Sequence, residues 1–299
     1  MNKIESAIQH IVDEAGVQQM GTSLRAEFDI LQKAHDAIHE FMLLAPLCFP
    51  AEATHEVSWQ SKSAFLVYHW EVFHHAHRSF IEALGTYYNA AFILLRTSLE
   101  LLLKGAFWEC LSHRQFRDNS PILDASSEGK AIKNFLWMSI EASPNIENEL
   151  DQISAGIFDR FGHKIEDPGF RPSIKTLVRQ LDQWGIFDSI PDPISVVYNG
   201  LYSGLSADVH VIPDKIDIGR RIDSERSELF EQLIDQPLLQ EYATTLHEIM
   251  DVGIVIELNI LQNLIERFES VQPKLAGRHA AIEQLGLQCG LARVRELLK

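Results

Sequence analysis

The chain has 299 residues, of which 46% are hydrophobic and 23% charged, and its formal net charge is −16. This is the composition of a globular protein with one large domain or two ordinary ones, and it excludes a broadly basic surface for nucleic acid or anionic membrane. A local basic cleft remains compatible with the net charge. The three cysteines are widely spaced and form neither a disulfide framework nor a C-x-x-C metal knuckle. We therefore expect a cytoplasmic protein, and the first residues show no apolar core of a signal peptide.

Two amphipathic patterns open the chain. Residues 3–19 and a second run from 24 to 42 repeat apolar residues at helical spacing, and Pro46 and Pro50 follow the second run. The pattern predicts an N-terminal helical hairpin over residues 1–45 that ends before Pro46. Residues 46–62 show no periodicity and are expected to be a linker.

The next two patterns predict the centre of the fold. A helix is expected from Ser63 to Leu84, and Gly85 then permits a break before a second helix that runs to Cys110. Together they form an antiparallel hairpin over about 63–110. The first helix has an apolar side made of Phe65, Leu66, Trp70, Phe73, Phe80, Ile81 and Leu84.

The second helix of this hairpin is apolar on nearly every side, which is typical of a buried helix. Its charged residues Arg96, Glu100 and Lys104 share one narrow stripe with Asn89, and residues four apart on a helix can pair. Ionised groups in the middle of the run also exclude a membrane span. The stripe is either the only wet strip of a central helix or the lining of a cleft, and sequence alone leaves both open.

The remainder of the chain also reads as helices, with an irregular segment at 113–129 and a charged loop at 211–223. Helix start signals, such as the cap Ser173 and the pair Asp192-Pro193, support several of them. The fold class we predict is all-α, a helical bundle over domain 63–270 with a C-terminal helical tail at 273–299. The helices expected after residue 129 span about 129–141, 144–162, 173–185 and 193–210. A long helix with a break near Pro237 is expected from the end of the 211–223 loop to about 270, and a last helix at 279–298 follows a boundary at Pro273–Gly277.

Nucleotide-binding and hydrolase motifs are absent from the sequence, so we expect no dinucleotide cofactor and no other cofactor. The segment 69–77 is rich in histidine, with His69, His74, His75 and His77. These residues point to different faces of a helix and lack the H-E-x-x-H spacing, so no metal site is expected there. His210 ends a predicted helix, where it either caps carbonyl groups or faces Arg96 and Glu100 as a proton-transfer group.

Two stretches carry a resemblance to a known superfamily. Gly85-Thr-Tyr87-Tyr-Asn-Ala90, followed by Leu95-Arg96-Thr-Ser-Leu99-Glu100, resembles the start of HEPN-like domains. The segment from Tyr198 through Leu201, Tyr202, Leu205 and Ser206 to His210 resembles the matching distal segment of a bacterial and archaeal branch. The resemblance covers about 63–270 in outline.

The resemblance implies an all-α bundle, often a homodimer, with a polar cleft at or near the dimer interface. Many HEPN-like proteins are metal-independent endoribonucleases of defence or RNA-processing systems, and these use an arginine followed four to six residues later by histidine. No arginine of this chain has that spacing; the nearest pair is Arg160 and His163. The resemblance and the stripe nominate Arg96, Glu100 and His210 as catalytic candidates, and as binding candidates Asn89, Lys104, Tyr202 and Ser206.

Three functions follow from these residues. The chain is a HEPN-like protein that acts through protein or RNA contacts in a stress or defence system, or a ribonuclease with Arg96 as phosphate clamp and His210 as general acid or base, or an oligomeric scaffold. The facing partner expected for the Arg96 stripe is the helix from Tyr202 to His210, with Glu257 as a further candidate.

Overall fold

The computed structural model describes residues 28–47, 64–112, 114–131, 133, 172–209, 216–223, 234–267 and 269–299. All elements in these ranges are helical, which confirms the all-α bundle. The helices expected at 3–19, beyond residue 133 and at 144–162 lie outside the described residues. The helices are α3 (Phe28–Leu47), α5 (Ala64–Leu84), α6 (Tyr88–Ser112), α7 (Arg114–Asp118), α8 (Pro121–Asp124), α12 (Ile174–Gln183), the π-helix η1 (Ile194–Tyr202), α13 (Ser203–Val209), α14 (Asp217–Asp223), α15 (Gln236–Ile260), α16 (Gln262–Arg267), α17 (Gln272–Leu285) and α18 (Gln288–Leu297).

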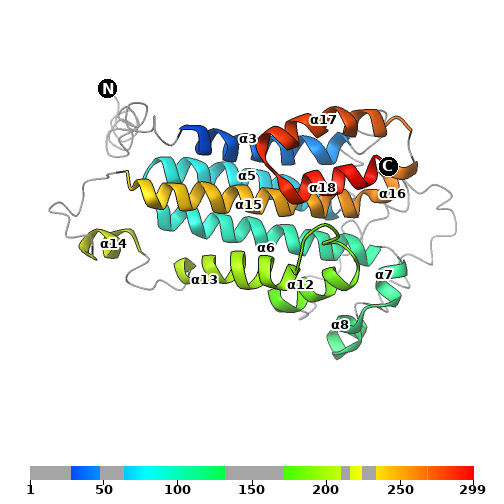
Figure 1. Ribbon diagram of the computed structural model, residues 1–299. Helices are drawn as coiled ribbons and strands as arrows, with labels where there is room; N and C mark the ends of the chain where they lie inside the picture. Colours follow the sequence, from blue (N-terminus) through cyan, green and yellow to red (C-terminus); the bar gives the residue numbers. More distant parts are fainter. Residues whose placement is uncertain are drawn as a thin grey trace, which may run out of the picture.

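The bundle is built around the hairpin of α5 and α6, as the sequence predicted (Figure 1). Helix α15 packs against α6 and α3, and α3 also packs against α5. The helices α12 and α13 flank α6, and η1 packs against α12, whereas α17 and α18 cover α3 and α15. The segment at 28–47, expected in a separate hairpin, thus lies within the bundle.

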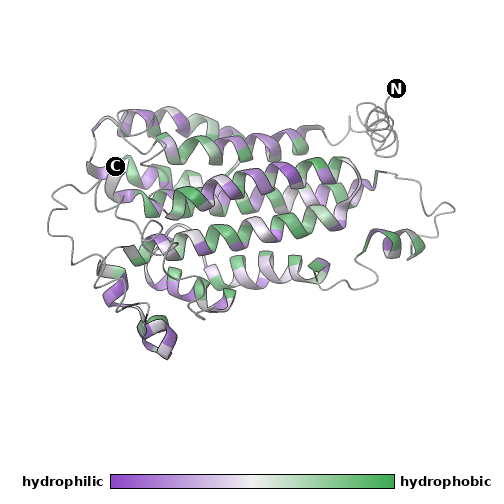
Figure 2. Ribbon diagram, turned by 180° about the vertical axis from the view of Figure 1, so that it is seen from behind, coloured by the Kyte–Doolittle hydropathy of each residue, from purple (hydrophilic) through white to green (hydrophobic). Residues whose placement is uncertain are grey.

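The centre of the core is shared between α6 and α15. Residues 252–258 of α15 are all buried, so this stretch is surrounded by other helices on every side. Figure 2 shows apolar and polar residues side by side along the other helices, as expected where one face is buried and another meets water. Close approach of α5 and α6 depends on Gly105, where an added Cβ would lie 2.6 Å from Cβ of Tyr68.

Pro46 lies inside α3, and the expected end of that helix before Pro46 is wrong. A proline in the last turn removes only the N–H that would have bonded to the carbonyl four residues back, here that of Met42. Buried Leu44 and Ala45 give the last turn an apolar contact with the core, and the helix continues to Leu47.

Prolines also mark the starts of two helices. A break is expected near Pro237, and Pro237 lies in the first turn of α15, where Asp235 accepts a hydrogen bond from the N–H of Leu238 at 3.1 Å. Pro273 likewise lies in the first turn of α17, so the expected boundary at Pro273–Gly277 is wrong. The expected single helix at 279–298 is divided by Gly286, which has a φ of 76°.

Other departures concern short or unusual helices. The segment expected to be irregular at 113–129 contains α7 and α8, and the loop expected at 211–223 contains α14. The helix expected at 193–210 is a π-helix followed by an α-helix. Ile81, expected on the buried side of α5, is 68% exposed. Among the described residues, none of the helices has the length and apolar character needed to cross a membrane.

Candidate functional site

The π-helix η1 positions two tyrosines beside α6. Asp192 begins this segment, and its Oδ1 accepts a hydrogen bond from the N–H of Ser195 at 3.1 Å. Tyr198 and Tyr202 follow, with nearly parallel rings whose centroids are 5.8 Å apart. π-Helical turns are rare, and those that occur often lie at functional sites, because the extra residue per turn changes which side chains share a face.

The charged stripe of α6 meets Tyr202. Nε of Arg96 donates to Oε1 of Glu100 at 3.1 Å, and Nη2 of Arg96 donates to the hydroxyl of Tyr202 at 2.8 Å. Nζ of Lys104 donates to the second carboxylate oxygen of Glu100 at 3.2 Å. The Arg96 guanidinium also lies 4.8 Å from the centroid of the Tyr202 ring, within the range of a cation–π contact. The structure therefore brings together Arg96, Glu100, Lys104 and Tyr202.

A pocket of about 460 Å³ opens between these residues and α12. Two aromatic pairs line it, Phe107 with Trp108 and Tyr198 with Tyr202. Its described polar side chains include those of Glu100, Lys104, Ser173 and Lys175, and further lining residues are Pro172, Ile174 and Leu177.

The pocket is locally basic within an acidic chain. Lys104 and Lys175 both line it, whereas Glu100 is the single carboxylate among the described lining residues, and that carboxylate also accepts a hydrogen bond from Arg96. Nζ of Lys175 lies 5.4 Å from the centroid of the Tyr198 ring. An aromatic floor with ammonium groups above it suits a flat, anionic ligand.

The remaining predicted site residues lie apart from this pocket. Nδ2 of Asn89 donates to the carbonyl of Asp208 at 3.1 Å, and its backbone N–H donates to Asp217. Asn89 therefore links α6 to α13 and α14. The hydroxyl of Ser206 donates to the carbonyl of Tyr202 at 2.8 Å, a contact within the helix. His210 lies outside the described residues.

Lys175, Phe107 and Trp108 are pocket residues that sequence reasoning did not nominate. The cap at Ser173 was predicted, and its Oγ accepts a hydrogen bond from the N–H of Thr176 at 3.2 Å. That signal places the start of α12, but it does not say which helix the lysine faces. Trp108 lies one turn beyond Lys104 on α6, and only this spacing could have suggested it.

Glu257 does not face the Arg96 stripe and is instead a partner of His69 in the core. Both side chains are fully buried, and Oε1 of Glu257 lies 2.6 Å from Nδ1 of His69. Burial lowers the pKa of His69 to about 3, and the carbonyl of Met42 acts in the opposite direction as a backbone acceptor. Burial also raises the pKa of Glu257, and the nearby carboxylate of Glu40 raises it further. Both shifts favour neutral side chains.

These two pKa shifts have opposite effects on stability. Glu257 binds its proton more tightly in the folded chain, so its contribution to stability falls as pH rises from its unfolded pKa to its raised folded pKa. His69 binds its proton less tightly in the folded chain, so its contribution falls as pH drops from 6.5 towards 3. The neutral pair is therefore most favourable in mildly acidic solution, between about pH 4.5 and 6.5.

We expect Glu257→Gln to become more stable relative to the unaltered chain as pH rises above about 4.5, because glutamine has no proton to lose. The difference should grow by about 1.4 kcal/mol per pH unit until the raised pKa of Glu257 is reached. Urea unfolding at several pH values measures it. A difference in the free energy of unfolding that stays constant between acidic and alkaline solution contradicts the raised pKa.

Comparison with protein-family models, with curated proteins and with solved structures finds no match for this chain. Its function is therefore argued from the geometry of its own residues.

Proposed function

We propose that this chain is a HEPN-like cytoplasmic protein that binds single-stranded RNA in the pocket between α6, α12 and η1. The supporting observation is the combination of stacked Tyr198 and Tyr202 with Lys104 and Lys175 around a single cavity. Proteins that bind single strands combine aromatic side chains, on which bases stack, with basic groups that contact the backbone. A role in a stress or defence system is part of this proposal through the resemblance to HEPN-like proteins.

The charge distribution limits the footprint on RNA to a few nucleotides. The chain as a whole carries −16, so it repels polyanions, and the basic groups of the pocket offer a small exception. If Lys104 and Lys175 each neutralise one phosphate, the logarithm of the binding constant should fall with that of the salt concentration with a slope of about −1.4. An exposed end or loop of an RNA fits this footprint better than a duplex.

The contacts of Arg96 favour binding over cleavage. Its Nε and Nη2 are occupied by Glu100 and by the Tyr202 hydroxyl, and its Nη1 is buried, so it holds one carboxylate and one ring of the pocket wall in place. A phosphate clamp needs donors that are turned towards the ligand. In the described lining of the pocket, Lys104 and Lys175 meet this requirement better.

We expect Tyr198→Ala to weaken RNA binding by about 5- to 150-fold, the loss of about 1–3 kcal/mol for one stacked base. Lys175→Gln should weaken binding and make the salt slope about 0.7 less steep. The measurement is fluorescence anisotropy of a short, labelled single-stranded RNA of mixed sequence at several salt concentrations. Lys33→Gln on α3 is the matched control, since it removes the same charge from an exposed position on a helix that does not line the pocket.

Two results would contradict the proposal: no binding of the RNA at low salt, or equal affinity for Tyr198→Ala, Lys175→Gln and Lys33→Gln. The same RNA, recovered after incubation, tests the alternative of a metal-independent ribonuclease. Cleavage that is lost in both Arg96→Ala and His210→Ala would make the protein an enzyme rather than a binding module.

A further inference from the structure

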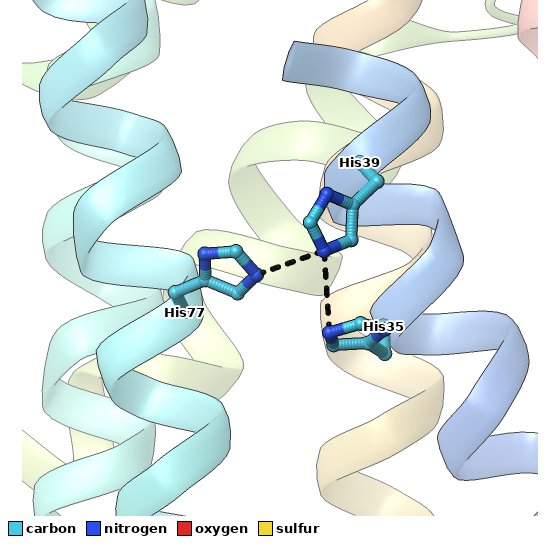
Figure 3. A group of neighbouring side chains, drawn as sticks. All are labelled: His35, His39 and His77. Carbon is cyan, nitrogen blue, oxygen red and sulfur yellow. Dashed lines mark hydrogen bonds between the residues drawn. The ribbon is translucent and has the colours of Figure 1, made fainter. Parts of the chain in front are cut away.

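Three histidines from two helices meet on the side of the bundle where α3 packs against α5. His35 and His39 are one turn apart on α3, and His77 faces them from α5 (Figure 3). The sequence signal was incomplete, since the i, i+4 spacing of His35 and His39 is visible but their partner is 38 residues further along. The sequence predicted no metal site in the chain, and the histidines weighed for one were those of the segment 69–77, of which His77 turns towards α3 (Figure 3).

The ring nitrogens converge on one point. Nε2 of His39 lies 3.3 Å from Nε2 of His35 and 3.3 Å from Nε2 of His77, and the three ligand nitrogens all lie within 4.8 Å of one another. Two imidazole nitrogens bound to a tetrahedral Zn²⁺ at about 2.0–2.1 Å are about 3.3–3.4 Å apart. Two sides of the triangle thus already have the spacing of a zinc site, and a small rotation of the outer rings closes the third.

Hydrogen bonds alone satisfy this arrangement poorly. The Nε2 atom of a neutral histidine carries either one hydrogen or one lone pair, not both. His39 Nε2 faces two other Nε2 atoms, so its single hydrogen or lone pair cannot make two good hydrogen bonds at once. A metal ion between the rings accepts one lone pair from each of them, which satisfies all three nitrogens.

The surroundings also suit a metal centre. Nδ1 of His35 lies 3.4 Å from Oδ1 of Asp36, and Nε2 of Gln32 donates to the same oxygen at 2.7 Å. A carboxylate on the outer nitrogen is the usual partner of a metal-binding histidine, because it fixes the ring orientation and makes the inner nitrogen more basic. The ring of Phe73 lies edge-on to that of His77, with centroids 4.4 Å apart.

The three histidines can be reached from solvent. The side chain of His35 is 36% exposed, which gives an ion a path from solvent.

From this geometry we infer that His35, His39 and His77 form a mononuclear site for a divalent transition-metal ion, with Zn²⁺ as the expected ion and a water molecule as fourth ligand. Imidazole ligands select zinc and its neighbours over magnesium and calcium, which prefer oxygen. The bound ion would join α3 to α5 and so fasten the N-terminal part of the described chain to the bundle. The site is independent of the RNA pocket, which no residue of α3 or α5 lines.

The test is a titration of the metal-free full chain with Zn²⁺, by calorimetry against a competing chelator, and with Co²⁺, by visible absorption. One ion per chain and the intense absorption of tetrahedral Co²⁺ are expected. Loss of a hydrogen-bond partner of a metal ligand weakens metal binding by about 10- to 100-fold. His39→Ala removes a ligand itself and should weaken Zn²⁺ binding by more than this, whereas Asp36→Asn alters only the partner of His35 and should weaken it by about 10-fold. His77→Gln serves if His39→Ala fails to fold.

His74→Ala is the matched control, since His74 lies exposed on the same helix three residues before His77. Its affinity for Zn²⁺ should equal that of the unaltered chain. The inference is overturned if Co²⁺ gives no tetrahedral spectrum, or if His39→Ala, His77→Gln and His74→Ala bind Zn²⁺ equally well.

Discussion

His69→Ala is expected to lower the free energy of unfolding by about 3–5 kcal/mol, the range for removing a large buried ring. The side chain is completely buried, and its ring centroid lies 4.5 Å from that of Phe41. Its removal leaves a cavity between α3 and α5. It also leaves the carboxyl group of Glu257 in the core without the imidazole beside it, which costs about 1–3 kcal/mol within that total.

Urea unfolding followed by circular dichroism measures this loss. His74→Ala is again the control, because an exposed histidine on the same helix should change stability by no more than about 0.5 kcal/mol. His69→Phe separates the two contributions, since it fills most of the cavity and still leaves Glu257 without an imidazole. A loss for His69→Ala no larger than that for His74→Ala would show that the His69–Glu257 pair does not organise the core.

Gly105→Ala should destabilise the protein by about 1–3 kcal/mol, the usual cost of excess volume in a packed core. The added Cβ would lie 2.6 Å from Cβ and 3.0 Å from Cγ of Tyr68, and Cβ of Tyr68 is fixed by its backbone, so the first contact is relieved only if α5 shifts away from α6. Alanine is the better helix former, so intrinsic propensity alone predicts the opposite sign.

Gly277→Ala on α17 is the control for this change, because no atom lies within 4 Å of its added Cβ. Here alanine should stabilise the chain by about 0.5–1 kcal/mol through helix propensity. Thermal unfolding of both variants measures the two effects side by side. If Gly105→Ala and Gly277→Ala raise the melting temperature equally, α5 and α6 are not in close contact at Gly105.

Local sequence signals predicted the parts of the fold that local interactions determine. The hairpin of α5 and α6 follows from helical periodicity and a glycine between two apolar runs, and the cap at Ser173 is a contact within four residues. The exposure of Ile81 could not be predicted in this way. Whether an apolar residue of an amphipathic helix is covered depends on where neighbouring helices end, which is not a local property.

The same division applies to the candidate sites. Arg96, Glu100 and Lys104 were placed on one stripe by helical spacing, and their mutual hydrogen bonds follow from that spacing. Their contact with Tyr202 was suggested only through the resemblance. Lys175 and the three-histidine cluster depend on which faces of separate helices meet, and no pattern within one helix contains that information.

Pro46 has a consequence for hydrogen bonding in the core. Because proline has no N–H, the carbonyl of Met42 makes no helical hydrogen bond to residue 46. This carbonyl is the backbone acceptor that raises the pKa of His69 against the larger, opposite effect of burial. A single proline near the end of α3 thereby leaves an acceptor available to the imidazole that lies beside Glu257 of α15.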